Sequence, residues 1–309
     1  MSELVTLGMP VFNGEPFVAE SLASLLAQDH DPLEILVADN ASTDATLECC
    51  RDLAARDPRV RFLTSDRNRG AAWNYNRLVA EARGTLFKWA AADDVCRPTF
   101  VSACVNALDA EGPGTVIAFP RSDLIDEHGE RIRAVDDSAL AVTSPVPWER
   151  VGQLLENRFE WHPVFGVMRT AVARSTDLIG PYVAADIVFL AEMAMRGRFV
   201  QVPETLFLRR YHAQRPLVAS LRFEDQAAWF DTAGGGGAQF PQLNVGAALV
   251  RAARRSGLPA AAAARCAAAA ASAYILPHWR HIGGEVKLAA RARVRGRRGA
   301  LAPRSTPGP

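Results

Sequence analysis

The sequence predicts an α/β fold in which a mostly parallel central sheet is flanked by helices, followed by a helical C-terminal extension. Three observations support this fold class. Short apolar runs alternate with amphipathic helical patterns over residues 1–119, which is typical of βαβ units. Several of these runs end in polar residues, as strands do at the carboxyl edge of a parallel sheet. Beyond residue 215 the chain is rich in alanine and then in arginine.

The expected elements follow from the spacing of apolar residues. Strands are predicted over 4–9, 33–38, 60–63, 85–91 and 115–119, and helices from 16, from 42 to 55, over 70–82 and after 98. Later elements are strands over 164–168, 199–202 and 206–210 and a helix over 186–195, whereas 131–150 has the character of a loop. We expect one domain over 1–215, with halves at 1–119 and 120–215, and an extension over 216–309.

Composition excludes several classes of protein. The chain has 309 residues, 49% of them hydrophobic, and a net charge of +1, so no overall charge favours nucleic acid. The five cysteines form no Cys-x-x-Cys pair and predict reduced thiols. The N-terminus lacks the pattern of a signal peptide, and the weakly polar run over 258–277 is a poor membrane span. We therefore expect a cytoplasmic protein.

Two adjacent carboxylates, Asp93 and Asp94, follow the apolar run 85–91. Carboxylates at the end of a buried strand are costly unless cations or hydrogen-bond donors meet them. A divalent metal that holds a diphosphate meets this need, since Mg²⁺ is commonly bound by one or two carboxylates and phosphate oxygens. The alternative is that Asp94 caps a helix beginning near Pro98. The pair alone does not decide between these interpretations.

Two further strand ends carry polar groups, with Asn13 after the first strand and Asp39 after the second. Ligands of open α/β sheets bind beyond the carboxyl ends of the strands, so these groups and the aspartate pair are expected to meet at one edge. The glycine fingerprint of dinucleotide-binding enzymes is missing after the first strand, and the chain contains no Walker motif.

An ordered set of short stretches carries a family resemblance. They are Met9-Pro10-Val11-Phe12-Asn13-Gly14, Ala38-Asp39-Asn40-Ala41-Ser42-Thr43-Asp44, Asn68-Arg69-Gly70 with Asn74-Tyr75-Asn76, and Lys88-Trp89-Ala90-Ala91-Ala92-Asp93-Asp94. With these spacings the chain resembles the inverting glycosyltransferases of family 2, which have the GT-A fold. The likeness covers roughly residues 4–100 and extends more loosely to about 212.

The resemblance implies roles for individual residues. Asp39 would bond the edge of the nucleotide base, Asp93 would lie near the ribose, and Asp94 would ligate Mg²⁺ or Mn²⁺ on the diphosphate. The remaining residues expected to bind the nucleotide are Pro10, Val11, Phe12, Asn13, Asn68 and Asn74. The halves 1–119 and 120–215 would serve the nucleotide and the acceptor.

This chain departs from the family pattern at three places. Ala92 stands where the metal motif usually begins with Asp, and Asn40-Ala41 replace the usual Asp-Gly. Tyr75 stands where many members have Arg, so a phosphate contact from that position is not carried over.

Asp186 is the expected catalytic base. An inverting transfer needs a group that takes the proton of the acceptor hydroxyl. The resemblance places such a carboxylate at the head of a helix about ninety residues after the metal motif, where Asp186 stands. The alternative is that Asp186 only caps this helix. Asp177 and Glu192 are the fallback bases, and Glu192 is otherwise expected to be a solvated helix residue.

Four residues are expected on the diphosphate or acceptor side. Arg210 and His212 resemble the Arg-x-His segment near the diphosphate, and their other interpretation is a strand-end charge with a surface His. Trp161 and His162 would border the acceptor, since an aromatic face suits a sugar ring; core packing is the other interpretation.

We therefore expect transfer from a nucleoside-diphosphate sugar, with a UDP-sugar favoured, in cell-surface polysaccharide or glycolipid assembly. Decoration of a natural product, a nucleotidyltransferase and a non-catalytic binding protein are the alternatives. The arginine-rich end from Arg280 onward is either a solvated terminus or a segment that contacts anionic lipid at the inner face of the membrane.

Overall fold

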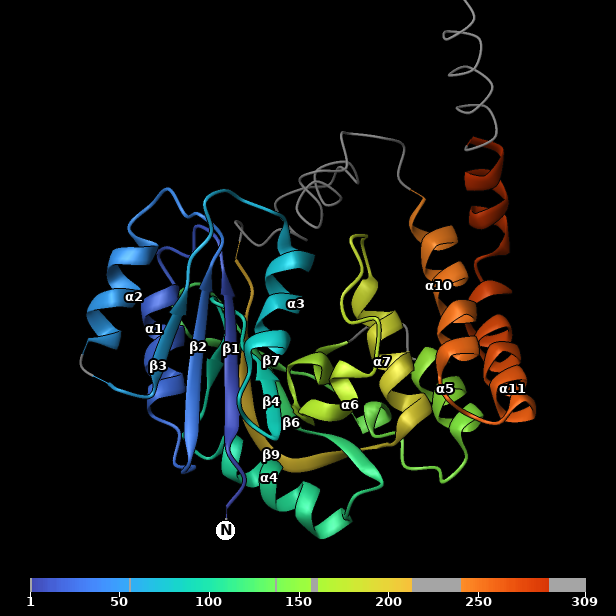
Figure 1. The fold of residues 1–309 in the computed structure, drawn as a ribbon, viewed down its shortest axis with the longest axis horizontal. Helices are drawn as coiled ribbons and strands as arrows, with labels where there is room; N and C mark the ends of the chain where they lie inside the picture. Colours follow the sequence, from blue (N-terminus) through green and yellow to red (C-terminus); the bar gives the residue numbers. More distant parts are fainter. Residues whose placement is uncertain (1, 56, 137, 157–160, 213–239, 289–309) are drawn as a thin grey trace, which may run out of the picture.

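The computed structural model describes residues 2–288 apart from 56, 137, 157–160 and 213–239. Within these residues one nine-stranded sheet has the order β3-β2-β1-β4-β8-β6-β9-β5, with β7 paired to β6, and helices flank it (Figure 1). The strands are β1 Val5–Val11, β2 Leu33–Asp39, β3 Val60–Leu63, β4 Leu86–Trp89, β5 Val95–Cys96, β6 Thr115–Ile125, β7 Arg131–Ala134, β8 Val167–Arg169 and β9 Arg198–Arg210. The α-helices are α1 Val18–Leu26, α2 Thr46–Ala54, α3 Ala71–Glu81, α4 Phe100–Glu111, α5 Pro147–Glu156, α6 Thr170–Arg174, α7 Ala185–Arg196, α10 Pro241–Arg255 and α11 Ala260–Ala270.

The parallel part of the sheet is confined to two regions. Strands β3, β2, β1 and β4 are parallel neighbours, and β6 runs parallel to β9. The short strands β5, β7 and β8 join antiparallel. All seven residues of β1 and of β2 are buried, because helices cover both faces of a parallel sheet.

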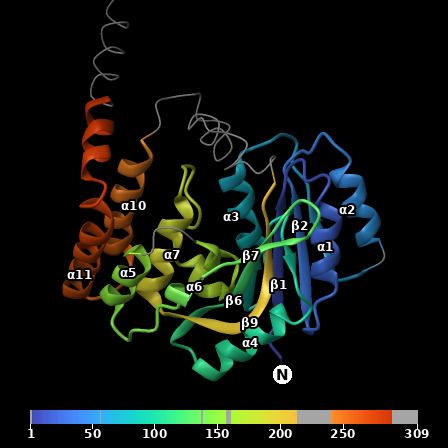
Figure 2. The ribbon, with the colours of Figure 1, turned by 180° about the vertical axis from the view of Figure 1, so that it is seen from behind.

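Two hydrophobic cores lie on the two faces of the sheet. One packs α1, α2 and α4 against it, with Leu22 and Phe100 fully buried. The other joins α3, α5 and α7 to α10 and α11 and includes Trp89, Phe189 and Leu249. The described helices of the C-terminal extension therefore share a core with α7 (Figures 1 and 2). The domain boundaries predicted from the sequence stay a prediction.

Helix α3 lies close to β1 because residue 8 is glycine. A Cβ atom built on Gly8 would come within 2.8 Å of the Phe87 ring and 3.1 Å of the Leu78 Cβ atom. A larger residue would therefore push α3 away from the strand.

Three sequence predictions of local structure are wrong. The region 131–150 is not a loop, since it contains β7 and the start of α5. Residues 162–165 form a 3-10 turn, and the strand predicted at 164–168 is the shorter β8. The strands predicted at 199–202 and 206–210 form one strand, β9, whose pairing with β6 shifts register between Pro120 and Ser122.

Among the described helices no single one is long and apolar enough to cross a membrane. One pair passes such a test together by length and composition, namely Ala260–Ile275 with Trp279–Leu288, which are bent by 88°. All five cysteines are free.

Candidate active site

The carboxyl ends of β1, β2 and β4 lie side by side. Strand β1 pairs in parallel with both neighbours, with Val11 opposite Asp39 on β2 and Gly8 opposite Trp89 on β4. Asp39 is therefore the last residue of β2, and the aspartate pair follows β4 at the same edge of the sheet. The topology thus brings together the acidic segments that the sequence analysis expects at one edge.

Strand β5 explains how the aspartate pair is held. It begins directly after Asp94, and its Val95 pairs antiparallel with Leu208 of β9. This pairing brings the end of β9 to the pair: the Arg210 N–H donates to Asp94 Oδ1 at 2.8 Å, and His212 Nε2 lies 3.1 Å from Asp93 Oδ2. Asp94 is 3% exposed and is not the cap of α4, since the N-cap residue is Thr99.

The Arg210 side chain is fully buried and holds this arrangement together. Its Nε donates to the Asp93 carbonyl at 3.0 Å, Nη1 donates to the Asp126 and Glu127 carbonyls, and Nη2 pairs with Glu20 at 2.5 Å. These contacts give the guanidinium a structural function, and its burial leaves little room for the diphosphate contact expected from the sequence.

His212 is better placed than Arg210 to meet a ligand. Its ring lies 4.5 Å from the Phe17 ring, centre to centre. Its Nδ1 is buried and has no hydrogen-bond partner among the described residues. The other ring nitrogen, Nε2, contacts Asp93, so His212 lies directly beside the aspartate pair.

The base-binding side is formed by the loops after β1 and β2. Asp39 is 2% exposed, and both of its carboxylate oxygens accept the Ser42 N–H, at 3.2 and 3.3 Å. Of the three residues expected to line the base, Pro10 and Val11 are buried inside β1. Phe12, the aromatic residue of the three, is 40% exposed.

The three asparagines expected to bind nucleotide hold loops in place. Asn13 Oδ1 accepts the Thr43 N–H at 2.8 Å and so ties the β1 loop to the β2 loop. Asn68 Oδ1 accepts the Gly70 N–H at 2.9 Å. Asn74, which is 2% exposed, donates to the Ala38 carbonyl at 2.7 Å. These contacts shape the site, and direct contact of the asparagines with a nucleotide stays a prediction.

Two departures from the family pattern have structural explanations. Asn40 donates from Nδ2 to Asn68 Oδ1 at 2.9 Å and to the Gly70 carbonyl at 3.2 Å, contacts that an aspartate could not make. Tyr75 packs against Trp89 with ring centres 5.8 Å apart, so it belongs to the core. Position 75 therefore does not supply the arginine charge that many family members have there.

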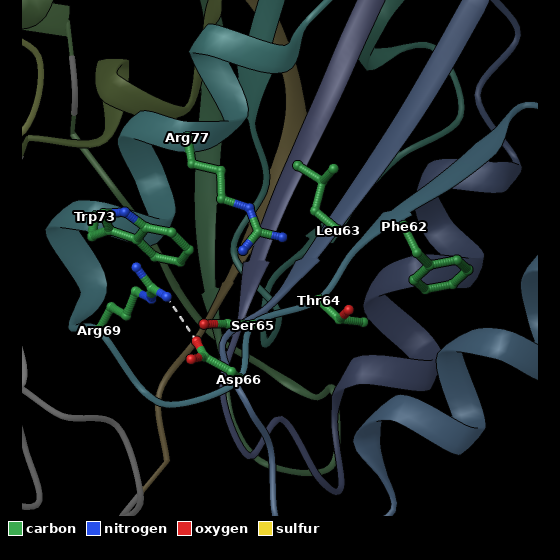
Figure 3. Close-up of a pocket in the computed structure, with 8 residues that line it drawn as sticks. All are labelled: Phe62, Leu63, Thr64, Ser65, Asp66, Arg69, Trp73 and Arg77. Carbon is green, nitrogen blue, oxygen red and sulfur yellow. Dashed lines mark hydrogen bonds and ion pairs between the residues drawn. The ribbon is translucent and has the colours of Figure 1, made fainter.

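A pocket of about 450 Å³ lies between the end of β3 and helix α3 (Figure 3). Arg69 and Arg77 each lie over the Trp73 ring, 5.0 and 4.9 Å from its centre, and Arg69 also pairs with Asp66 at 2.7 Å. In Figure 3 the Arg77 guanidinium extends from α3 toward the strands. The remaining lining residues are Phe62, Leu63, Thr64 and Ser65.

Arg77 is the site residue that sequence reasoning missed. Partial burial lowers the pKa of its guanidinium, while the nearby carboxylates of Glu81 and Asp39 oppose this change. Arg77 therefore brings a positive charge close to the expected base-binding carboxylate. The residue lies two positions beyond the place where the family pattern has arginine, and only its i, i+4 spacing from Trp73 on α3 signals it.

Asp186 lies in the first turn of α7, and the N-cap residue is Ala184. The alternative interpretation, in which Asp186 is the N-cap residue of this helix, is therefore wrong. Burial of the Asp186 carboxylate raises its pKa to about 6. Hydrogen bonds from the Ile187 N–H and from its own N–H act in the opposite direction and lower the pKa. Figure 1 shows α7 beginning at the same end of the molecule as the carboxyl ends of β1 and β2. A carboxylate with this pKa suits a base that works near neutral pH.

The fallback bases are engaged elsewhere. Glu192 is 1% exposed and accepts the Asp177 N–H at 2.8 Å, so the expectation of a solvated Glu192 is wrong. The exposed Asp177 side chain pairs with Arg255 at 3.0 Å. Of the two residues expected to border the acceptor, Trp161 is half-buried against the core and His162 is 3% exposed, edge-on to Phe119.

Groups of three or more His, Cys, Asp or Glu placed to hold a metal ion do not occur among the described residues. A metal that bridges protein and diphosphate does not need such a group, because phosphate oxygens complete its coordination.

Comparison with known proteins identifies the family. The model of "Glycosyl transferase family 2" matches residues 6–179. An uncharacterized glycosyltransferase of Haemophilus influenzae is 24% identical over 219 residues, which are 69% of this chain and 67% of that protein. The succinoglycan biosynthesis protein ExoO of Rhizobium meliloti is 31% identical over 137 residues, 44% of this chain but only 38% of ExoO.

Solved structures show the same fold at low sequence identity. S. aureus TarS in complex with UDP-GlcNAc superposes with a TM-score of 0.62 at 16% identity, over 88% of this chain and 72% of that chain. The mannosyltransferase PcManGT of Pyrobaculum calidifontis, in complex with GDP-Man and Mn²⁺, gives 0.54 at 18% identity, over 98% and 81%. The chain has the GT-A fold and belongs to glycosyltransferase family 2.

Proposed function

We propose that this protein transfers one sugar from a nucleoside-diphosphate sugar to an acceptor hydroxyl, with inversion and with the help of Mg²⁺ or Mn²⁺. The observation that supports this most is the meeting of Asp39, Asp93 and Asp94 at one sheet edge. A UDP-sugar is the favoured donor, in line with the UDP-GlcNAc complex of TarS. The assembly of cell-surface polysaccharide or glycolipid is the proposed setting, and the name of ExoO agrees with it.

The reaction is a single displacement. The oxygen of the acceptor hydroxyl attacks the anomeric carbon, and the bond from that carbon to the diphosphate oxygen breaks on the opposite face. Asp186 takes the hydroxyl proton, and the nucleoside diphosphate leaves with the bonding electron pair. The raised pKa of Asp186 makes it a stronger base than an exposed aspartate.

The residues at the sheet edge fit a divalent cation. Asp94 and Asp93 offer carboxylate oxygens, the kind of ligand that Mg²⁺ and Mn²⁺ prefer, and the His212 ring contacts Asp93 through Nε2. The cation, when bound, neutralises charge that develops on the leaving diphosphate. The chain's own contribution is to hold Asp94 rigidly through the Arg210 backbone.

Arg77 is proposed to stabilise the bound nucleotide beside Asp39. Replacing Arg77 with alanine should weaken UDP binding about tenfold, because a charge-assisted hydrogen bond contributes about 1.5–3 kcal/mol. Calorimetric titration of UDP measures the change. Arg67→Ala is the matched control, since Arg67 is exposed, lies close by and does not line the pocket. Equal losses in the two variants would exclude this function of Arg77.

A donor screen tests the function as a whole. We expect UDP-sugars to raise the melting temperature of the protein in the presence of Mn²⁺ more than in its absence. Slow hydrolysis of one of these donors should follow. Release of pyrophosphate from a nucleoside triphosphate would instead indicate a nucleotidyltransferase, and donor binding without any turnover would indicate a binding protein. Either result contradicts the proposal.

A further inference from the structure

The last described helix, Trp279–Leu288, and the bend before it carry exposed apolar side chains. Leu276, Trp279, Val286 and Leu288 are 63%, 62%, 48% and 57% exposed. The described residues contain seven large exposed hydrophobic side chains, and these four lie within one stretch of 13 residues. Isolated exposed apolar residues are common on proteins, but such a concentration marks an interaction surface.

The inner side of this helix is clearly defined. Ile282 faces α10, where its side chain would lie 3.8 Å from a Cβ atom built on Gly246. Glu285, the one acidic residue of the helix, accepts the backbone N–H groups of Gln242 and Leu243 at 3.3 and 2.8 Å. The helix is therefore fixed to the N-terminal end of α10, and its acidic side chain points toward the protein.

The outer side combines apolar and basic residues. At 100° per residue, Arg280 and Lys287 lie opposite Glu285, with Trp279 and Val286 beside them. The exposed Leu276 lies just before the helix, in the bend. Arg280 also lies over the Trp279 ring, 5.4 Å from its centre. Figures 1 and 2 show this helix at the outer margin of the molecule, on the side of α10 away from the sheet. We name the surface formed by Trp279, Arg280, Val286 and Lys287, together with the exposed Leu276 just before the helix, the terminal face.

We propose that the terminal face docks on a membrane surface rich in anionic phospholipid. Apolar and aromatic side chains flanked by basic ones are the pattern of helices that lie in the lipid interface, where the apolar groups enter the acyl boundary and the cations meet phosphate. The sequence after this helix, 289–309, adds six arginines and no acidic residue, so the local charge matches an anionic surface. The described face supplies the apolar contact, which charge in 289–309 alone would not provide.

Docking and sugar transfer are separate properties of the chain. The terminal face belongs to the C-terminal helices, whereas the proposed donor site lies at the sheet edge. Vesicle binding can therefore be measured without a donor, and its failure would leave the proposed transfer intact.

Sedimentation of the full chain with lipid vesicles tests the proposal. We expect binding to vesicles of phosphatidylcholine with phosphatidylglycerol, and much weaker binding to phosphatidylcholine alone. The double variant Leu276→Ser with Trp279→Ser should reduce the partition coefficient by more than about tenfold. Arg280→Gln and Lys287→Gln should each reduce it by about fivefold at low salt.

Two controls make the result decisive. Ile132→Ser removes an equally exposed apolar residue, on β7, and should bind like the unchanged protein. A variant in which glutamine replaces the six arginines of 289–309 should still bind the vesicles, though more weakly. Adding the Leu276→Ser and Trp279→Ser changes to this variant should remove the remaining binding. Normal binding by the Leu276/Trp279 variant would overturn the proposal. The proposal would also be overturned if the unchanged protein sedimented as a dimer and the Leu276/Trp279 variant as a monomer, because a second copy of the chain would then occupy the terminal face.

Discussion

Asp94→Asn should abolish metal-dependent binding of the donor. The amide oxygen still accepts the Arg210 N–H that Asp94 Oδ1 accepts at 2.8 Å, so the fold around the site should persist. The negative charge that attracts the cation is lost. We expect transfer to fall by at least about a hundredfold, because metal stabilisation of the leaving charge contributes several kcal/mol. Calorimetric titration of UDP with and without Mn²⁺, together with a transfer assay, measures both effects.

Two further variants separate charge from structure at this position. Asp94→Ala removes the hydrogen-bond acceptor as well, so it should lower the melting temperature more than Asp94→Asn does. Asp109→Asn removes one carboxylate from an exposed position on α4 and should change neither binding nor transfer. If Asp94→Asn retained the Mn²⁺ effect on UDP binding, the proposed metal site would be elsewhere.

Asp186→Asn should stop transfer but leave donor binding unchanged. A general base contributes about 10²–10⁴ in rate, and asparagine cannot accept the proton. In the unchanged protein the rate should fall as the pH drops through about 6, because protonation of Asp186 then removes the base. Transfer rates and UDP affinities measured between about pH 5 and 8 separate the two steps.

Stability provides an independent readout for Asp186. Its pKa in the folded protein is raised from 3.8 to about 6, so the folded state holds the proton more tightly than the unfolded chain. The free energy of unfolding therefore declines as the pH rises from about 4 to 6, and above this range the carboxylate is destabilising. Asp186→Asn should therefore raise the free energy of unfolding at pH 7, by an amount on the order of 1 kcal/mol, because asparagine removes the buried negative charge. Urea unfolding measures this gain.

Asp177→Asn is the matched control for Asp186. Its carboxylate is exposed and pairs with Arg255 at the surface, where an ion pair contributes little. This variant should keep both transfer and its pH profile. If Asp177→Asn lost transfer and Asp186→Asn retained it, the catalytic base would be Asp177.

The sequence predicts the nucleotide half of the fold well because its signals are local. Strands β1, β2 and β3 and helix α3 lie close to their predicted positions, since each follows from an uninterrupted apolar run or a clear helical period. Their parallel order then places Asp39 and the aspartate pair at one edge. This part of the site is therefore predictable from the order of the strands and from the rule that ligands of open α/β sheets bind beyond the carboxyl ends of the strands.

The remainder of the site depends on contacts between distant segments. Strand β5 has only two residues and no periodicity, yet its pairing with β9 brings Arg210 and His212 to the aspartate pair. The burial of Arg210 follows from this pairing and from the Glu20 contact 190 positions away. Arg77 lines the pocket because its long side chain extends from α3 toward the strands (Figure 3). The spacing of residues along the sequence does not specify the direction of such a side chain.

The most direct test of the central claim is to locate Mn²⁺ and UDP in a crystal of the complex. We expect the anomalous signal of Mn²⁺ within coordinating distance of the Asp94 carboxylate and of the diphosphate, with the uracil ring beside Asp39 and Phe12. A nucleotide bound away from the carboxyl ends of β1, β2 and β4, or a metal that contacts neither Asp93 nor Asp94, would contradict it.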